Sequence, residues 1–377
     1  MYRYMQEGAE KYFEIDELLE RKPISPDEAF LRENICGEVV LVTGAAGSVG
    51  SEIVRQILNY QPEKVILLDN AETPLHKLSM ELQACPIHVV LCDIRNEIRL
   101  RRVFSDHTPG IVYHAAAYKH LPMMETHPYE SVEVNLGGTI NLLKVSEEYG
   151  VNKFVQLSTD KAVHPVSVMG ATKLLAELFC RKFDRENHLD VVITRFGNVL
   201  GSNGSIIPLF IEQIKKGGPL TVTHPEVMRY FMTIKEAAIL MLQAGFINEK
   251  SKTFVFDLGD PIKIEVLANK LTSKISPQTS IAIEYIGMRN GEKIVERLVT
   301  EDENQIKTKF PGITALENSR EATNTEVAQI KELVKNIDHL SEDSVLHKIT
   351  EILPGYSPSK FQPSSEIEYR LYNAIQS

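Results

Sequence analysis

A carboxylic acid and an amine stand next to each other at Asp160 and Lys161, in the stretch Ser158-Thr159-Asp160-Lys161. Such a pair could act as a general acid and a general base. When a sugar carbon is oxidised to a ketone, the neighbouring C–H becomes acidic, so a base can take that proton while an acid helps the next hydroxyl to leave as water. Lys161 must be neutral to act as the base. We therefore expect this pair to remove water from an oxidised sugar, with an exposed charge pair in a surface loop as the alternative.

Met169 and Lys173 follow on a helix predicted at 167–183. Residues four apart on a helix share one face, so these two side chains can meet the same ligand. The thioether of Met169 cannot exchange a proton. Proton transfer is therefore expected from Asp160 and Lys161 and not from Met169.

A glycine-rich turn, Thr43-Gly44-Ala45-Ala46-Gly47-Ser48-Val49-Gly50, follows a predicted strand and opens a predicted helix. Glycines in this context permit a tight turn and let a pyrophosphate approach the helix N-terminus. The turn predicts dinucleotide binding through Gly44, Gly47, Ser48, Val49 and Gly50.

Two acidic residues end the next two predicted strands. Asp69 can accept hydrogen bonds from both ribose hydroxyls of NAD and would repel the 2′-phosphate of NADP, so we expect NAD as the cofactor and not NADP. Asp93, followed by Ile94, could contact the adenine. A helix-capping role is the alternative for Asp93.

Alternating strands and helices must position these residues. Helices are expected at 48–59, 129–149 and 167–183, between short apolar strands. The predicted strands are Val39–Thr43, Val65–Leu68, His88–Leu91, Ile111–His114, Phe154–Leu157 and Val191–Thr194. The predicted fold class is therefore α/β, a Rossmann-type doubly wound parallel sheet with a smaller C-terminal α/β substrate lobe.

The same pattern predicts the divisions of the chain. We expect an N-terminal arm at 1–37, outside the main fold, with a helix at 14–21 and a second helix starting at Ile24-Ser25-Pro26-Asp27. A Rossmann domain is expected at 38–200, with a return segment at about 233–262. The substrate lobe is expected at 201–232 and 263–354, and a C-terminal tail at 355–377.

Composition excludes several classes of partner. The formal net charge of −10 over 377 residues argues against nucleic-acid or acidic-membrane binding, which need a basic face. The four cysteines form no C-x-x-C motif and no histidines stand at metal-ligand spacing, so reduced thiols and no metal site are expected. The sequence has no signal peptide and no apolar run of roughly 18 residues, which predicts a cytoplasmic protein without a membrane span.

Several motifs together resemble the extended short-chain dehydrogenase/reductases. Within that group the chain is similar to the soluble UDP-N-acetylglucosamine 4,6-dehydratases of bacterial polysaccharide and glycan biosynthesis. The resemblance runs from about residue 37 to about residue 300. It rests on the glycine turn, Leu68-Asp69-Asn70, the stretch 114–125, Ser158-Thr159-Asp160-Lys161-Ala162, Met169-Gly170-Ala171-Thr172-Lys173, the stretch 195–202, Met228-Arg229-Tyr230-Phe231-Met232 and Arg289-Asn290-Gly291-Glu292-Lys293.

The resemblance implies a reaction and further site residues. Hydride would leave sugar carbon 4 for NAD, Lys161 would take the carbon-5 proton, Asp160 would assist loss of the carbon-6 hydroxyl, and hydride would return to carbon 6. Thr159 would hold the carbon-4 hydroxyl, and Lys173 the nicotinamide ribose. Met169 stands where many relatives carry tyrosine, which leaves the acceptor of the carbon-4 hydroxyl proton open between Asp160 and a water. Ala115 and Ala116 would contact the cofactor, and the UDP-sugar would be held by Lys119, His120, Asn198, Arg229, Arg289 and Glu292.

Two other functions stay open at this stage. A nucleotide-sugar 4-epimerase would share the fold and NAD, but it normally needs tyrosine at the Met169 position and has no use for an Asp-Lys pair. A non-catalytic NAD-binding protein would explain the missing tyrosine but not Thr159, Asp160, Lys161 and Lys173. The resemblance also implies a homo-oligomer, a dimer or a hexamer.

Overall fold

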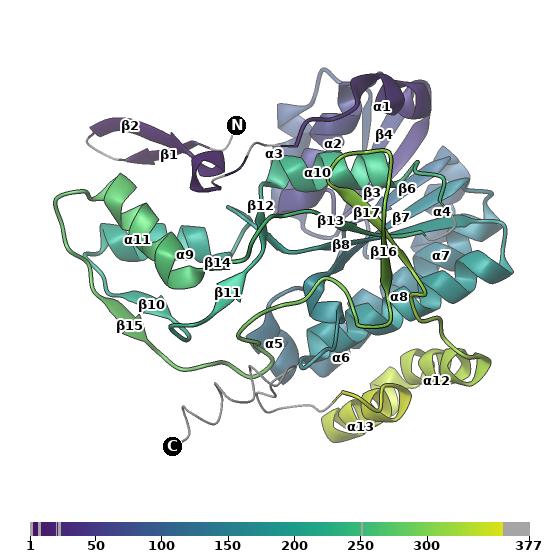
Figure 1. The fold of residues 1–377 in the computed structure, drawn as a ribbon. Helices are drawn as coiled ribbons and strands as arrows, with labels where there is room; N and C mark the ends of the chain where they lie inside the picture. The colour runs from purple at the N-terminus through teal and green to yellow at the C-terminus, as the bar shows by residue number, and fades with distance from the viewer. Residues whose placement is uncertain (1–2, 7–8, 20, 22–23, 250–251, 357–377) are drawn as a thin grey trace.

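A nine-stranded sheet forms the centre of the molecule (Figure 1). The computed structural model describes residues 3–6, 9–19, 21, 24–249 and 252–356. Across the sheet the strands run in the order β16-β17-β13-β8-β7-β6-β3-β4-β5. Their bounds are β3 (Val39–Thr43), β4 (Lys64–Asp69), β5 (Ile87–Leu91), β6 (Ile111–His114), β7 (Lys153–Thr159), β8 (Asp190–Phe196), β13 (Thr253–Phe256), β16 (Asn304–Lys307) and β17 (Ile313–Glu317).

The strand order reverses between β3 and β6, and most of the residues predicted for the site lie at or after the ends of β3, β4, β6 and β7 around this reversal. The chain runs outward through β4 and β5 on one side of β3, and through β6, β7, β8 and β13 on the other. All seven of these strands are parallel, which confirms the predicted Rossmann-type sheet. Ligands of open α/β sheets bind where the order reverses, beyond the carboxyl ends of the strands.

Helices cover both faces of the sheet because the inner strands are apolar on both sides. On one face lie α4 (Glu97–His107), a π-helix (Ser131–Gly138), α7 (Thr139–Glu148) and α8 (Val168–Glu186). On the other lie α1 (Glu28–Ile35), α2 (Ser48–Leu58), α3 (Glu72–Glu81) and α10 (Ile234–Ala244). The short helices α5 (Leu121–Thr126) and α6 (Pro128–Glu130) connect β6 to the π-helix.

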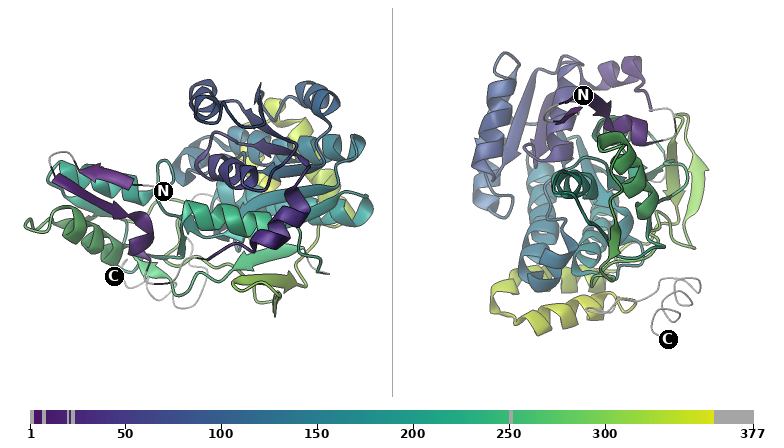
Figure 2. Two further views of the ribbon diagram at one scale, coloured as in Figure 1. Left: turned by 90° about the horizontal axis from the view of Figure 1, so that it is seen from above. Right: turned by 90° about the vertical axis from the view of Figure 1, so that its left-hand side faces the viewer.

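A smaller lobe stands beside the sheet, as seen from above in Figure 2. It has its own apolar core, in which Phe210, Ile211 and Ile214 pack as core residues. Its main elements are α9 (Ile206–Lys215), β10 (Leu220–Val222), β11 (Met228–Arg229), β14 (Ile262–Lys263), α11 (Ile264–Ile275) and β15 (Ile283–Tyr285). The short parallel pair β9 (Asn198–Val199) and β12 (Phe231–Met232) links the two lobes.

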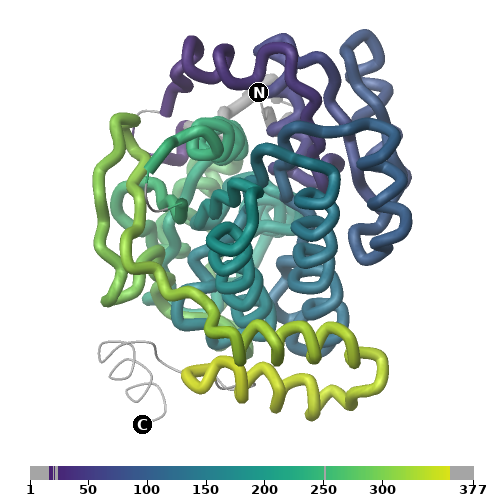
Figure 3. Tube along the Cα trace, turned by 90° about the vertical axis from the view of Figure 1, so that its right-hand side faces the viewer, coloured from purple at the N-terminus to yellow at the C-terminus, as the bar shows by residue number. Residues whose placement is uncertain are grey.

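The chain beyond residue 300 departs from the expected division. We expected 263–354 in the smaller lobe, but β16 and β17 extend the central sheet as an antiparallel hairpin next to β13. The helices α12 (Asn324–Lys335) and α13 (Glu342–Ile352) then pack on the α8 face, where Ile330, Leu333 and Val345 are fully buried. Figure 3 shows this helical hairpin in yellow along one side of the molecule.

The N-terminal segment departs from expectation in two ways. The strands β1 (Arg3–Gln6) and β2 (Ala9–Glu14) and a 3₁₀ turn (Ile15–Leu18) replace the helix expected at 14–21. The expected helix start at Asp27 is confirmed, since its side chain accepts from the Phe30 amide. However, α1 is not outside the main fold: Leu31 and Ile35, four apart on one face, are fully buried in the core.

Two further expectations concern the ends of the chain and the membrane. Of the tail expected at 355–377, all but Gly355 and Tyr356 lies outside the described residues. Within the part of the chain that the structure describes, every helix is too short or too polar to cross a bilayer.

Candidate active site

The glycine turn between β3 and α2 is packed against the backbone that follows β6. Gly44 has φ +64°, and a Cβ at this position would lie 2.6 Å from the Ala116 amide nitrogen. A Cβ on Gly50 would lie 2.0 Å from the Gly44 carbonyl oxygen. Side chains at either position would therefore force the turn apart. Gly47 caps α2 without a side-chain hydrogen bond, which leaves the first amides of the helix open to an anionic ligand.

Asp69, at the end of β4, is tied to the same turn. Its Oδ2 accepts from the Ala46 amide at 2.9 Å, and its Oδ1 accepts from the Ala71 amide at 2.9 Å. The carboxylate is therefore fixed against the glycine turn in the position from which it could accept from a ribose. The turn, Asp69 and the Ala115–Ala116 backbone together could hold a dinucleotide.

Asp93 and Ile94 lie one strand further out. The guanidinium of Arg95 holds the pKa of Asp93 below its usual range, and Asn70 donates to the same carboxylate at 3.3 Å. Ile94 is buried, and its side chain lies where a Cβ on Gly138 would be, within 2.4 Å. In this structure Asn96, and not Asp93, caps α4.

Thr159, the last residue of β7, forms a single hydrogen-bonded turn with Asp160 and Lys161, which follow it. The Lys161 ammonium donates to Asp160 Oδ1 at 2.9 Å, and the Thr159 hydroxyl donates to the same oxygen at 2.9 Å. Asp160 is fully buried and the Lys161 side chain is 17% exposed. The exposed-loop alternative is therefore wrong. Among the described residues, Asp160 Oδ2 is buried without a hydrogen-bond partner, so the carboxyl group keeps one oxygen for another ligand.

Helix α8 packs directly on this turn through a glycine. A Cβ on Gly170 would lie 2.3 Å from the Lys161 carbonyl oxygen. Met169, just before it, is 4% exposed and packs in a small apolar cluster with Leu121 and Met124. Lys173, one turn further on, donates to the Leu157 carbonyl at 2.6 Å. Burial, which outweighs its acidic neighbours, lowers the pKa of Lys173 to about 8.

Two more side chains reach Lys161 from other elements. Asn198 of β9 accepts from the Lys161 ammonium at 3.1 Å. Glu296 lies 4.0 Å away and is itself 1% exposed. Arg229 of β11 donates to the Met228 and Ile294 carbonyls, and its charge lowers the pKa of Glu296. Asn198, predicted from a sequence motif, is thus brought to the Thr159–Lys161 turn. Arg229 has no described contact with that turn and acts there only through its charge on Glu296, a residue that the sequence reasoning missed.

The remaining residues expected to bind the substrate lie around this centre in two groups. Lys119 donates to Ser202 at 3.4 Å, and the His120 ring lies within 2.6 Å of where a Cβ on Gly204 would be. Arg289 and Glu292 bracket Gly291, and the Arg289 amide donates to the Glu292 carboxylate at 3.4 Å.

Gly291 anchors that second group near α8. It has φ +77°, and a Cβ there would lie 2.6 Å from Ser167, the N-cap of α8, and 3.2 Å from the Glu125 carboxylate. Neither the Arg289 nor the Glu292 side chain makes a contact with the Thr159–Lys161 turn among the interactions that the structure describes.

A buried asparagine on the π-helix was also missed. Asn135 accepts from the Tyr118 amide at 2.8 Å and donates to the Tyr118 carbonyl at 3.0 Å, which clamps the backbone that carries Lys119. It also donates to Thr172 of α8 at 3.4 Å. The segment 132–143 also contains Glu133, Thr139 and Asn141, so no sequence pattern singled out Asn135 for this clamp.

Behind the turn lies a buried network of charges. Ser158 donates to Glu177 at 2.6 Å, and Glu177 also accepts from Arg195 at 2.8 Å and from Arg181 at 3.1 Å. Arg195 donates further to Glu303 at 2.7 Å. Burial works to raise the pKa of Glu177, but the two arginines and the Ser158 hydroxyl lower it to about 2.

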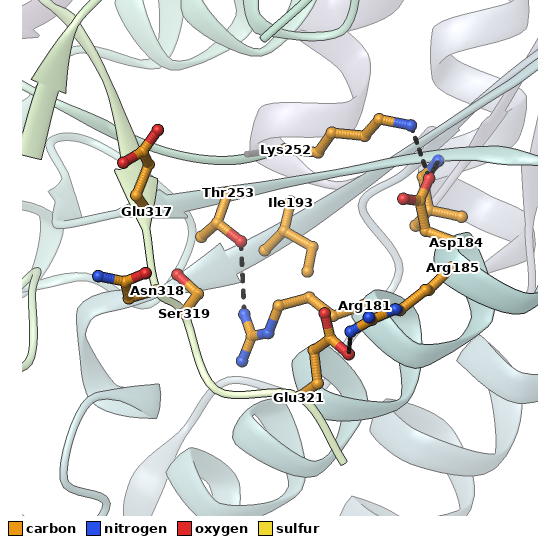
Figure 4. A pocket seen from close by; sticks show the side chains of 11 residues that line it. Arg181, Asp184, Arg185, Ile193, Lys252, Thr253, Glu317, Asn318, Ser319 and Glu321 are labelled. Atoms are coloured by element: carbon orange, nitrogen blue, oxygen red, sulfur yellow. Dashed lines mark hydrogen bonds and ion pairs between the residues drawn. The ribbon is translucent and has the colours of Figure 1, made fainter. Parts of the chain in front are cut away.

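This network reaches the opposite surface of the molecule. Arg181 lines a cavity of about 580 Å³ there, where its guanidinium points toward Thr253 (Figure 4). The cavity is lined by matched cations and acids, including the Lys252–Asp184 and Arg185–Glu321 pairs. It contains none of the residues that the sequence predicted for the site. The network is joined to the Thr159–Lys161 turn through Ser158, which directly precedes the turn and donates to Glu177.

Comparison with known proteins gives the following relatives. A family model described as polysaccharide biosynthesis protein matches residues 40–318. The capsular polysaccharide biosynthesis protein CapD of Staphylococcus aureus is 44% identical over 300 residues, which cover 78% of this chain and 50% of CapD. A UDP-glucose 4-epimerase of Rickettsia bellii is 31% identical over 338 residues, which cover 81% of this chain and 98% of the epimerase. The chain spans about half the length of CapD and of the probable polysaccharide biosynthesis protein EpsC of Bacillus subtilis.

Solved structures share the fold. Pen from Bacillus thuringiensis superposes with a TM-score of 0.70 at 28% identity, covering 81% of this chain and 99% of Pen. DesIV, a dTDP-glucose 4,6-dehydratase from Streptomyces venezuelae solved with NAD bound, superposes with a TM-score of 0.62 at 22% identity, covering 80% of this chain and 99% of DesIV. At this identity the likeness to DesIV shows the fold alone.

Proposed function

This chain belongs to the polysaccharide biosynthesis protein family and has the fold of the extended short-chain dehydrogenase/reductases, and from this membership we propose that it is an NAD-dependent UDP-N-acetylglucosamine 4,6-dehydratase. The product would be a UDP-linked 4-keto-6-deoxy sugar. One observation carries the proposal: a buried acid and an amine, 2.9 Å apart, lie on one turn beside the reversal of strand order.

The cofactor proposal rests on the glycine turn. NAD would supply the hydride acceptor at carbon 4 and the donor at carbon 6. Gly44 and Gly50 leave room for a pyrophosphate where side chains would clash, and the open amides of α2 favour its negative charge. The fixed carboxylate of Asp69 supports NAD over NADP.

The roles of the other residues follow from their positions. Lys161 takes the carbon-5 proton, and Asp160 donates a proton to the leaving carbon-6 hydroxyl. Thr159 orients the carbon-4 hydroxyl beside them, and the proton of that hydroxyl passes to a water as carbon 4 is oxidised. The Lys161 ammonium returns a proton to carbon 5 when carbon 6 is reduced. Lys173 binds the nicotinamide ribose. With a pKa of about 8, Lys173 is mostly an ammonium at neutral pH and can donate hydrogen bonds to the ribose hydroxyls.

The UDP part is held by the charges of Lys119, Arg229 and Arg289 and by the neutral ring of His120, whose pKa is lowered by burial and by the charge of Lys119. Lys119 and His120 lie on one side of the site, and Arg229 and Arg289 come from the smaller lobe and the loop that follows it. A diphosphate is best matched by such guanidinium and ammonium groups. Asn198 and Glu292 complete the proposed contacts.

The packing of Met169 favours a dehydratase over a 4-epimerase. Both reactions take the proton of the carbon-4 hydroxyl, but a 4-epimerase normally takes it with a tyrosine at this position and has no use for the Asp160–Lys161 pair. Here the position is a methionine, buried among Leu121 and Met124. The 31% identity to the Rickettsia bellii epimerase keeps that reaction as the alternative to test.

Incubation of the purified protein with UDP-N-acetylglucosamine, followed by mass spectrometry of the nucleotide sugar, tests the proposal. Loss of one water from the substrate is the expected result. An isomer of unchanged mass would identify an epimerase instead. Retention of NAD without turnover would identify a non-catalytic binding protein.

A further inference from the structure

Glu296 is a buried carboxylate that the proposed reaction does not use. It is 1% exposed and lies in the loop that follows the Arg289–Lys293 motif. Its Oε1 is 4.0 Å from the Lys161 ammonium. Lys161 therefore faces three oxygens, those of Asp160 at 2.9 Å, Asn198 at 3.1 Å and Glu296 at 4.0 Å.

The surroundings of Glu296 keep it ionised. The Lys293 ammonium lies 3.2 Å from Glu296 Oε2 and is equally buried. Burial works to raise the pKa of Glu296, but the charges of Lys293, Lys161 and Arg229 hold it well below its usual range. Glu296 is therefore a carboxylate at neutral pH, and it acts on Lys161 as a fixed negative charge.

The loop that carries Glu296 is tied to the catalytic turn. Lys293 donates to the Val163 carbonyl at 2.7 Å, two residues beyond Lys161. On the other side, Gly291 lies against Ser167 at the start of α8. Glu296 is thus held in place by bonds that do not involve Lys161 itself.

We propose that Glu296 is a positioning residue that sets the pH at which Lys161 gives up its proton and that holds the amine toward Asp160 and Asn198. This inference rests on the proposed function for the role of Lys161 as a base. The charged groups around Lys161 are Asp160 on its own turn, Glu296 and Lys293 on the loop, and Arg229 on β11. Lys173 of α8 is bonded to the strand that leads into the turn.

The proton balance shows what Glu296 controls. A proton that moves from Lys161 to Asp160 along their hydrogen bond converts an ammonium and a carboxylate into an amine and a carboxylic acid. These are the forms that the elimination needs. When the amine takes the carbon-5 proton and the acid protonates the departing hydroxyl, the ion pair is restored. Because a nearby carboxylate stabilises the ammonium, Glu296 opposes this transfer. For the same reason Glu296 opposes loss of the Lys161 proton to solvent, and it is this second process whose midpoint depends on pH.

Competitive acetylation of Lys161 across a pH series, read by mass spectrometry, tests this directly. In Glu296→Gln, the midpoint of Lys161 labelling should fall by about one pH unit, because an opposing charge is lost at close range. In Lys293→Met, the midpoint should rise, because Glu296 loses its counter-charge. Glu236→Gln is the matched control: it removes a buried carboxylate that caps α10, and its midpoint should equal that of the wild type.

Glu296→Gln and Lys293→Met should move the midpoint in opposite directions. If one of these variants misfolds, the other still tests the inference. Equal midpoints in the wild type, Glu296→Gln and Lys293→Met would overturn the inference, as would shifts of the same sign. Glu296→Asp, which keeps the charge, should stay closer to the wild-type midpoint than Glu296→Gln does.

Labelling needs no turnover, so it separates this inference from the proposed function. If the wild type removes water, kcat/KM can be compared across pH for the two proteins. The acid limb of the Glu296→Gln profile should lie at lower pH than that of the wild type. A shifted midpoint with no water loss in the wild type would leave the Glu296–Lys161 coupling standing and end the dehydratase proposal. Water loss by the wild type without a shifted midpoint in Glu296→Gln would support the dehydratase proposal and end the Glu296–Lys161 coupling.

Discussion

At the scale of single residues, the site depends on one hydrogen bond between an acid and an amine. Asp160 is fully buried and Lys161 nearly so, and they share a turn with Thr159. Neighbouring groups of opposite character are what an elimination requires, because one must donate a proton while the other accepts one.

Substitution at this pair should separate chemistry from binding. Lys161→Met and Asp160→Asn should each lower the rate of water loss by about 10²- to 10⁴-fold, because each removes one partner of the proton transfer. Neither residue touches the glycine turn, so the NAD content of the purified protein should be unchanged. Near-normal rates in both variants would show that the turn is not the catalytic centre.

At the scale of elements, contacts between backbones place the catalytic turn. Helix α8 approaches it at Gly170. The glycine turn approaches the backbone after β6 at Gly44, and α2 approaches the glycine turn at Gly50. Glycine is needed at these positions because the backbones approach so closely that no Cβ fits between the packed segments.

Gly170→Ala should therefore displace the turn without unfolding the protein. The added methyl group would lie 2.3 Å from the Lys161 carbonyl oxygen, so the turn or the helix has to shift. We expect a fall of about ten-fold or more in the rate of water loss, since small displacements of reacting groups are costly. Gly355→Ala, where a Cβ meets nothing within 4 Å, is the control and should keep the wild-type rate. Equal rates in the two variants would contradict this account.

The inner elements could be predicted from sequence, and the outer ones could not. β3 and β6 occur at the predicted residues because buried parallel strands are unbroken apolar runs. β16 reads Asn-Gln-Ile-Lys and is exposed throughout, so no pattern marks it as a strand of the central sheet.

The same contrast applies within the site. Thr159, Asp160 and Lys161 were found because they directly follow a predicted strand and so had to lie at the edge of the sheet. Glu296 was missed because a glutamate in a charged stretch normally faces water. Its loop is tied to the Val163 carbonyl through Lys293, and its carboxylate lies 4.0 Å from Lys161. Both partners are more than a hundred residues away along the chain, and short-range sequence patterns do not encode such contacts.

At the scale of the whole molecule, the buried charges behind the site link stability to pH. The pKa of Glu177 is about 2 in the folded protein, against an ordinary value of 4.5. A depressed pKa means that the stabilisation is complete above about pH 4.5 and is lost as the pH falls toward about 2. Its size is on the order of 3 kcal/mol.

Glu177→Gln should test this contribution. Removal of one partner leaves Arg195 buried with less compensation, which typically costs about 3–5 kcal/mol. We expect a lower free energy of unfolding at pH 7, measured by urea denaturation, and a weaker dependence on pH between about 4.5 and 2 than in the wild type. Glu212→Gln, in an exposed pair with Lys216, should change neither quantity. A wild-type acid profile in Glu177→Gln would contradict the assignment.

The bond between Asp69 and Ala46 limits how the proposed coenzyme preference could be redesigned. The usual route to NADP acceptance replaces the acidic residue after the second strand with a small or basic one. Here the same carboxylate also holds the Ala46 amide in place. A redesign that deletes it would loosen the loop that must grip the pyrophosphate, so a retained hydrogen-bond acceptor, as in Asp69→Asn combined with a nearby arginine, is the better starting point.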